Sequence, residues 1–234
     1  MLAKRILLFV FFATYSIAVL FLLLRKKLLL FLHPDFVPLA VAAAIALAIV
    51  ALGILLLRHY HAITIAPWRI VLLCIPLLLI FFTNLRPLSS ASAVDRTLAA
   101  GSLTIGRHVS SSQFATKPEK RSLYQWVIAL NADPEPSHYD GQTVKVRGFI
   151  AHDPTLPDDQ ILVGRFILTC CAADARLLSL PVQKSVSLLQ NVADDQWVDI
   201  EGKMAMVEKD GKRSLIVVPS KVEMIAIPDD PYEI

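Results

Sequence analysis

Cys170 and Cys171 stand next to one another, and Asp174 follows after two alanines, so three potential metal ligands lie within five residues. Two thiols and a carboxylate are donor groups that a thiophilic metal ion such as zinc accepts. Residues 160–171 form an apolar run that is typical of a buried strand, and neighbouring residues of a strand point to opposite faces. We therefore expect both sulfur atoms to reach one metal only if the strand is distorted.

Three interpretations of this segment are open. The sequence favours a structural one, in which one or both cysteines are buried in the core and Asp174 occupies a turn. The alternative is a thiophilic metal cofactor with Cys171, Asp174 and His152 as candidate ligands, although the histidines of this half show no ligand spacing. A disulfide between adjacent cysteines needs a strained peptide and is the third interpretation. Arg165 is a further candidate binding residue.

The sequence contains none of the common catalytic motifs. It has no Gly-rich phosphate loop, no Ser-His-Asp order and no GxSxG. The acidic pairs at 194–195 and 229–230 precede a strand and lie near the end of the chain, where we expect solvated turns. We therefore expect a protein that is not an enzyme and that uses no cofactor other than the alternative metal.

The elements that must position these residues belong to two halves of opposite charge. The 234 residues are 55% hydrophobic and 18% charged, with a net charge of +3. Residues 1–88 contain eight basic residues and one acidic residue, net +7, whereas residues 89–234 contain 15 basic and 19 acidic residues, net −4. The positive charge therefore flanks apolar segments and forms no basic face, which argues against nucleic acid as a partner.

Uncharged runs in the first half predict a membrane anchor of about three transmembrane helices. Residues 6–24 and 36–57 would extend over about 28 and 33 Å as helices, which matches the hydrocarbon core of a bilayer. A third span is predicted over residues 68–87, where an aromatic and a basic residue extend a shorter apolar run into the headgroup region. We expect an integral protein of the inner membrane, with the lipid bilayer as a partner.

The orientation of this anchor does not follow from charge. Its basic residues are divided equally between the two sides of the membrane, so the positive-inside rule selects neither orientation. We prefer an extracytoplasmic C-terminal domain. The thiols do not decide the orientation either, because an oxidising compartment outside could pair them and the cytoplasm would keep them reduced.

Residues 89–121 are predicted to form a linker with a short helix, and residues 122–234 a mostly β domain. Ser122 is a suitable N-cap for a helix over residues 123–130. Period-two alternation and turn residues predict six short strands, over 143–151, 160–171, 180–186, 197–207, 214–218 and 221–227. A small OB-like barrel is the best match because closure removes exposed strand edges, and a β-sandwich is the alternative.

Four segments of the second half resemble the bacterial YcgQ-like family. They are GQTVKVRGFI, RFILTCCAADA, DDQWVDIEG and PDDPYEI, in this order and after N-terminal hydrophobic segments. The family is described as a subunit of a two-component membrane permease complex. The resemblance implies a non-catalytic accessory subunit with a larger polytopic permease as its partner. Its barrel would cap or regulate that partner, or bind the transported substrate.

Two other functions are open at this point. One is a membrane-anchored domain that handles metal ions or thiols with Cys170, Cys171 and Asp174. The other is a stand-alone envelope protein whose barrel binds other proteins. The apolar runs contain no internal ionisable residue, so the anchor by itself does not resemble a transport pathway.

Overall fold

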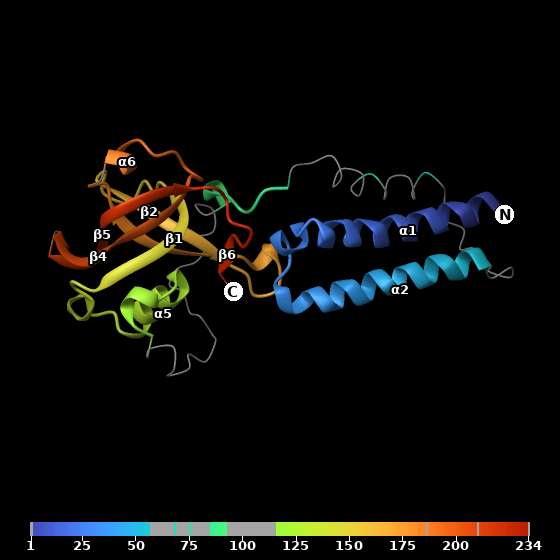
Figure 1. Ribbon diagram of the computed structural model, residues 1–234, viewed down its shortest axis with the longest axis horizontal. Coiled ribbons are helices and arrows are strands. Elements are labelled where there is room, and N and C mark those ends of the chain that lie inside the picture. Colours follow the sequence, from blue (N-terminus) through green and yellow to red (C-terminus); the bar gives the residue numbers. More distant parts are fainter. Residues whose placement is uncertain are drawn as a thin grey trace. The chain divides into compact units, whose positions relative to one another are not determined.

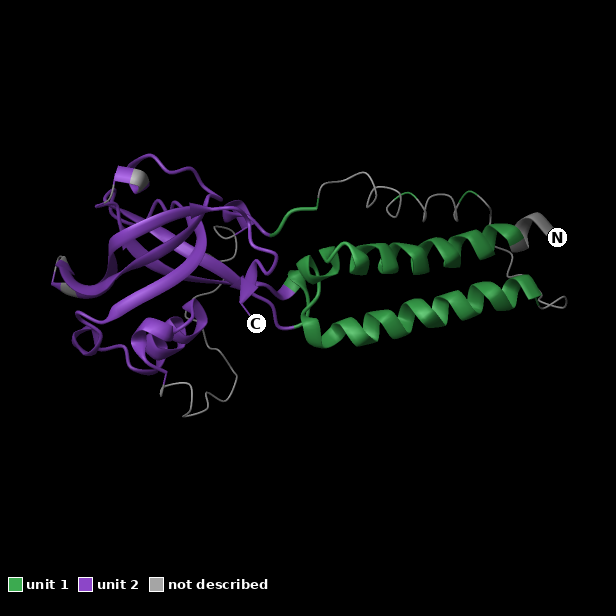
Figure 2. Ribbon diagram, viewed as in Figure 1, with its two compact units in different colours: residues 1–87, 170–173 green, residues 88–169, 174–234 purple. Residues whose placement is uncertain are grey.

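The chain folds into two compact units, which comprise residues 1–87 with 170–173 and residues 88–169 with 174–234 (Figure 2). The computed structural model describes residues 2–56, 68, 75, 85–92, 116–185, 187–209 and 211–233. Most of the third predicted span, residues 68–87, and most of the predicted linker, residues 89–121, therefore lie outside the described residues.

The first unit contains two long helices, α1 (Leu2–Leu24) and α2 (Val37–Leu56), which pack against one another (Figure 1). Both are long and apolar enough to cross a bilayer by length and composition, which confirms the first two apolar runs as helices of that kind. Two 3₁₀ helices, η1 (Lys27–Leu30) and η2 (Pro34–Phe36), connect them. Pro34 is the first residue of η2, a position at which the missing N–H has no helical partner to lose.

The second unit is built on a closed five-stranded barrel (Figure 1). Its strands are β1 (Thr143–Ala151), β2 (Gln160–Ile167), β3 (Arg176–Gln183), β4 (Trp197–Lys209) and β5 (Lys212–Ile225). Antiparallel pairs join β1 to β2, β2 to β3, β4 to β5 and β1 to β4, and a parallel pair joins β3 to β5. The ring β1-β2-β3-β5-β4 closes on β1, which confirms the OB-like barrel. The β-sandwich alternative is wrong, because the five strands form one closed sheet.

The connection between β2 and β3 begins and ends four residues earlier than the sequence predicts, because β3 starts at Arg176 and not at residue 180. β2 ends at Ile167, which pairs with Arg176 at the start of β3, whereas the apolar run predicts a strand as far as residue 171. An apolar run by itself does not show where cross-strand partners end. The earlier strand end places Cys170 and Cys171 in a loop.

Strand β5 joins two segments that the sequence predicts as separate strands, 214–218 and 221–227. It continues through Pro219, which lies opposite Gly202 of β4. The register shifts there, between Glu201 and Gly202, as in a β-bulge. Bulges tolerate a residue without an N–H donor, so this proline interrupts the ladder without ending the strand.

Helix α5 (Leu123–Ala132) packs on β3 and β2 and begins, as predicted, after Ser122. The Ser122 hydroxyl accepts the Gln125 N–H at 3.3 Å, and the Gln125 side chain accepts the Ser122 N–H at 3.0 Å, which completes a capping box. A short helix, α6 (Ser187–Gln190), stands between β3 and β4. The buried face of α5 completes a core with strand residues that include Val144, Ile161, Val163, Leu178, Val198 and Ile200.

Candidate functional site

The two adjacent cysteines lie in the connection from β2 to β3, residues 169–174, which we call the paired-cysteine loop. The Thr169 N–H donates to Asp174 Oδ1 at 3.2 Å, so the Asp174 side chain folds back across the loop. Residues Ala172–Asp174 form a single 3₁₀ turn before β3 begins. A tight turn, and not a pleated strand, therefore sets the directions of the two thiols.

The donor atoms of the paired-cysteine loop converge. The sulfur atoms of Cys170 and Cys171 are 3.7 Å apart, and they lie with a carboxylate oxygen of Asp174 within 4.8 Å of one another. All three residues are half-buried. The expectation that adjacent thiols face opposite ways is wrong here, because that alternation holds only for residues within a strand.

The separation of the sulfur atoms is that of two metal ligands. A disulfide joins its sulfur atoms at about 2.05 Å, whereas the two sulfur atoms lie 3.7 Å apart here and are not bonded to one another in this structure. Two thiolates at about 2.3 Å from a tetrahedral metal ion are held about 3.8 Å apart. Among the residues that the structure describes, this is the one group of three histidine, cysteine or acidic side chains whose donor atoms meet in this way.

A second segment of the chain lies along the paired-cysteine loop. Leu32 and Cys171 form an antiparallel bridge with a backbone hydrogen bond on either side. In one of these bonds the His33 N–H donates to the Cys170 carbonyl at 3.0 Å. Residues 170–173 accordingly group with the helical unit, as their colour in Figure 2 shows.

His33 is a polar residue of this bridge that the sequence interpretation did not single out. Its side chain is 7% exposed, and its Nδ1 accepts the Asp35 N–H at 3.3 Å. The same nitrogen lies 3.5 Å from Asp35 Oδ2. The available signal was the presence of two polar residues, His33 and Asp35, in the short stretch between the apolar runs 6–24 and 36–57.

Arg165, the further binding candidate, is engaged by the C-terminal segment. Strand β6 (Tyr232–Glu233) runs parallel to β2, and the Arg165 guanidinium donates to the carbonyls of Asp230 and Tyr232. It also lies 3.3 Å from Glu233 Oε1 and 5.9 Å from the centre of the Trp197 ring. Burial raises the pKa of Glu233 despite the nearby positive charge. Arg165 therefore holds β6 on the barrel.

His152, the remaining candidate ligand, does not join the paired cysteines. Its Nδ1 lies 2.8 Å from Asp194 Oδ1, which also accepts the His152 backbone N–H at 2.9 Å. Both side chains are exposed. The pair belongs to a surface turn, and the acidic pair 194–195 lies in that turn as the sequence predicts.

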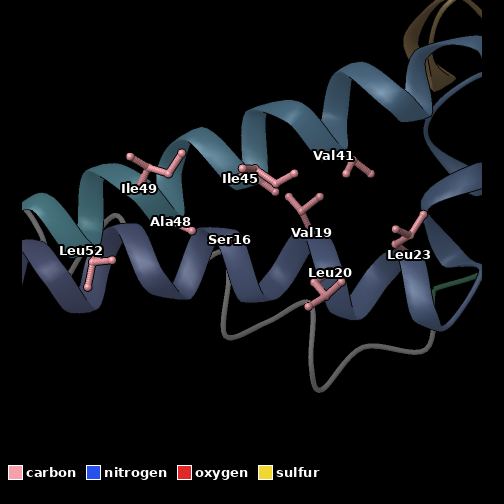
Figure 3. A pocket seen from close by; sticks show the side chains of 10 residues that line it. Ser16, Val19, Leu20, Leu23, Val41, Ile45, Ala48, Ile49 and Leu52 are labelled. Atoms are coloured by element: carbon pink, nitrogen blue, oxygen red, sulfur yellow. The ribbon is translucent and has the colours of Figure 1, made fainter.

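The two long helices line an open apolar cavity of about 300 Å³ (Figure 3). Its lining is aliphatic apart from Ser16, and Ala44 and Ala48 of α2 are among the residues that line it. A cavity with a single hydroxyl suits an acyl chain or an apolar side chain better than a polar solute.

The chain is distantly similar to a curated bacterial protein. The UPF0703 protein YcgQ of Bacillus subtilis (strain 168) is 27% identical to it over 99 residues, which are 42% of this chain and 34% of that protein. The similarity thus spans about one third of the relative's length.

Solved structures that resemble this chain include an OBody, AM2EP06 bound to hen egg-white lysozyme, at 18% identity over 38% of this chain and 83% of that one, with a TM-score of 0.25. Asparaginyl-tRNA synthetase from Pyrococcus horikoshii, complexed with asparaginyl-adenylate, is 19% identical over 40% of this chain and 23% of that one, with a TM-score of 0.24. These TM-scores are low, so the assignment of the barrel is based on its strand order and not on the similarity to these structures. The family model of the DUF1980 C-terminal domain matches residues 119–233. This part of the chain contains α5, the barrel, the paired-cysteine loop and β6.

Proposed function

We propose that the protein is a membrane-anchored accessory protein that binds a thiophilic divalent metal ion at the paired-cysteine loop. The observation that carries this proposal is the convergence of Cys170, Cys171 and Asp174, whose donor atoms lie within 4.8 Å of one another. Two thiolates and a carboxylate compensate the charge of a divalent ion, and they belong to the ligand set of zinc. The half-burial of the three residues leaves a path for an ion from solvent.

The membrane anchor in this proposal consists of α1 and α2. Each helix has many large apolar side chains exposed along its length, among them Ile17, Leu20, Leu39, Ile45, Ile49 and Leu56. A continuous apolar surface of this extent is unfavourable in water, whereas the hydrocarbon core of a bilayer covers it. We propose that these helices anchor the protein in the inner membrane and that its barrel lies outside the cytoplasm.

Membership of a permease complex is a second candidate function, and the apolar cavity between α1 and α2 favours it. Small residues on one face of a membrane helix let another helix approach closely, and Ala44 and Ala48 line this cavity. A helix of a polytopic permease would bury this face. The metal-binding barrel would then cap or regulate the partner, or bind the ion that the partner moves, without catalysis of its own.

Removal of the two thiols is expected to abolish metal binding. We expect the full-length chain in detergent micelles to bind one Zn²⁺, and the C170S/C171S variant to bind at least about 100-fold more weakly, because hydroxyls are poor zinc ligands. Competition with a chromophoric chelator measures the affinity, and elemental analysis measures the stoichiometry.

Cys74→Ser provides the matched control, since it removes the third cysteine of the chain and leaves the paired-cysteine loop intact. It should bind zinc as the native chain does. Native affinity in the C170S/C171S variant, or no stoichiometric zinc in the native chain, would contradict the proposal.

Insertion of a large side chain into the helix cavity is expected to release a permease partner. When the native chain is purified at its natural expression level in mild detergent, a polytopic membrane protein should co-purify in fixed proportion. Ala48→Trp fills the cavity and should abolish this association. Leu39→Trp, at a position that is 67% exposed and is not among the lining residues, should retain it. If the native chain is purified without such a partner, membership of a permease complex is contradicted.

A further inference from the structure

We propose that His33 is a fourth ligand of the same metal ion and that Asp35 is the residue that positions its imidazole. The proposal depends on the metal site put forward above, and it completes a tetrahedral set of two thiolates, a carboxylate and an imidazole. The proposal is based on the backbone bridge between Leu32 and Cys171, which brings His33 close to the cysteines. Nothing in the spacing of His33 and the cysteines along the sequence suggests this set.

The bridge places His33 directly across from Cys170. Leu32 pairs with Cys171, and the His33 N–H donates to the Cys170 carbonyl at 3.0 Å, so the next residues in each direction face each other. This hydrogen bond holds the backbones of the two residues close together. An imidazole therefore has the length to reach a metal ion bound to the Cys170 sulfur. Its nitrogens lie outside the group of three donor atoms, so metal binding requires the ring to turn toward them.

Asp35 holds the His33 ring in a way that suits a metal ligand. The Asp35 N–H donates to Nδ1 at 3.3 Å, which assigns the ring proton to Nε2 in the metal-free state. Asp35 Oδ2 lies 3.5 Å from the same Nδ1. When Nε2 binds a metal ion, the ring proton moves from Nε2 to Nδ1. The Asp35 N–H then no longer donates to Nδ1, and the Asp35 carboxylate can accept a hydrogen bond from the Nδ1 proton. Carboxylates in this outer position orient metal-bound histidines and raise their basicity.

The burial of His33 supports a role beyond that of a surface connector. Its side chain is only 7% exposed, whereas the carboxylate of Asp35 beside it is 77% exposed. A buried imidazole is costly unless its polar atoms are used, and one nitrogen is used by Asp35. Coordination of a metal ion would use the other nitrogen.

The four proposed ligands together limit which metal ions this site can bind. Two sulfurs, one nitrogen and one oxygen at tetrahedral positions suit Zn²⁺, and Co²⁺ can occupy the same sites as a spectroscopic probe. Mg²⁺ and Ca²⁺ require six or more oxygen ligands, which these residues do not offer. We therefore expect the loop to select zinc-like ions over alkaline-earth ions.

His33→Asn in the full-length chain is the variant that tests the fourth ligand. Asparagine keeps a side-chain acceptor for the Asp35 N–H and is a good cap, but it has no Nε2. With Co²⁺ as the probe and Zn²⁺ as the competitor, we expect H33N to weaken metal binding at least about tenfold and to shift the d–d absorption bands. Thiolate-to-cobalt charge-transfer absorption should persist. Asp35→Asn should weaken binding about tenfold without moving the d–d bands, as an outer-shell change does.

Two further variants test whether the change in metal binding is due to the loss of the His33 imidazole. His138→Asn is the matched control, because His138 is exposed and lies 2.6 Å from Asp133 Oδ2, and it should leave affinity and spectrum unchanged. His33→Cys supplies a different ligand at the same position and should recover tight binding with stronger charge-transfer absorption. Native affinity and spectrum in H33N, together with loss of binding in C170S/C171S, would overturn the role of His33 and leave the three-ligand site standing. Absence of charge-transfer absorption in the native chain would overturn both.

Discussion

Gly148→Ala is expected to destabilise the barrel by about 3 kcal/mol or more, the upper part of the range for overpacked cores. Gly148 lies in β1 where this strand passes close to β2. A Cβ at this position would stand 2.5 Å from the carbonyl oxygen of Gly164 and 3.0 Å from Cγ1 of Val163. The first of these is a backbone atom, so relief of the clash requires β1 and β2 to separate at the point where the barrel closes.

Urea unfolding of the full-length chain in micelles, followed by circular dichroism, measures this effect. A loss of about 3 kcal/mol is a large share of the 5–15 kcal/mol that stabilise an ordinary domain. Gly53→Ala adds the same methyl group where no atom lies within 4 Å, and it should leave the unfolding of the barrel unchanged. A free energy of unfolding for Gly148→Ala within about 0.5 kcal/mol of native would show that the strands can move apart without cost.

Trp126→Ala is expected to cost about 3–5 kcal/mol, as deletions of large buried aromatic side chains do. Trp126 is fully buried on the inner face of α5, with its ring centre 6.3 Å from that of Tyr139 and 4.8 Å from the Arg121 guanidinium. Truncation would leave a cavity between α5 and the barrel and would remove the contact that anchors this helix.

Trp126→Phe separates the packing of this side chain from its polarity. The indole N–H of Trp126 is buried and has no hydrogen-bond partner among the described residues, so phenylalanine removes an unsatisfied donor while it keeps most of the apolar volume. We expect it to cost less than half as much as alanine in the same unfolding experiment. Equal losses for the two variants would mean that the indole N–H has a partner.

Local signals in the sequence were sufficient to predict several elements of the second unit. The strand predicted over residues 143–151 has the same bounds as β1, and its burial alternates as far as Gly148, whereas both faces are buried from Phe149 to Ala151. Ser122 starts α5 through a cap that involves only neighbouring residues. Strands β4 and β5 pair as far as Lys209 and Lys212, and Gly211 between them has a φ of +73°, which a glycine adopts without strain. Each of these features is decided by interactions between residues close in sequence.

The sequence prediction was wrong where distant partners decide the structure. Residues 160–171 are mostly apolar on both faces of the predicted strand, and the end of β2 at Ile167 depends on the pairing of this residue with Arg176. The continuity of β5 through Pro219 depends on a bulge in β5 itself, where Pro219 and Lys221 face consecutive residues of β4. Neither partner is visible in the pattern of the strand itself, because hydrophobic periodicity reports burial and not pairing.

The amino-acid sequence by itself determined that this chain has an apolar, basic first half and an acidic, mostly β second half, and that Cys170, Cys171 and Asp174 are its best candidates for chemistry. Only the tertiary structure decided that these three residues converge, because their directions are set by the loop after β2 and not by the pleat of a strand. It also decided that His33, 137 positions before Cys170 in the chain, lies beside them. That contact is a backbone bridge between distant segments, and no local preference of either segment encodes it.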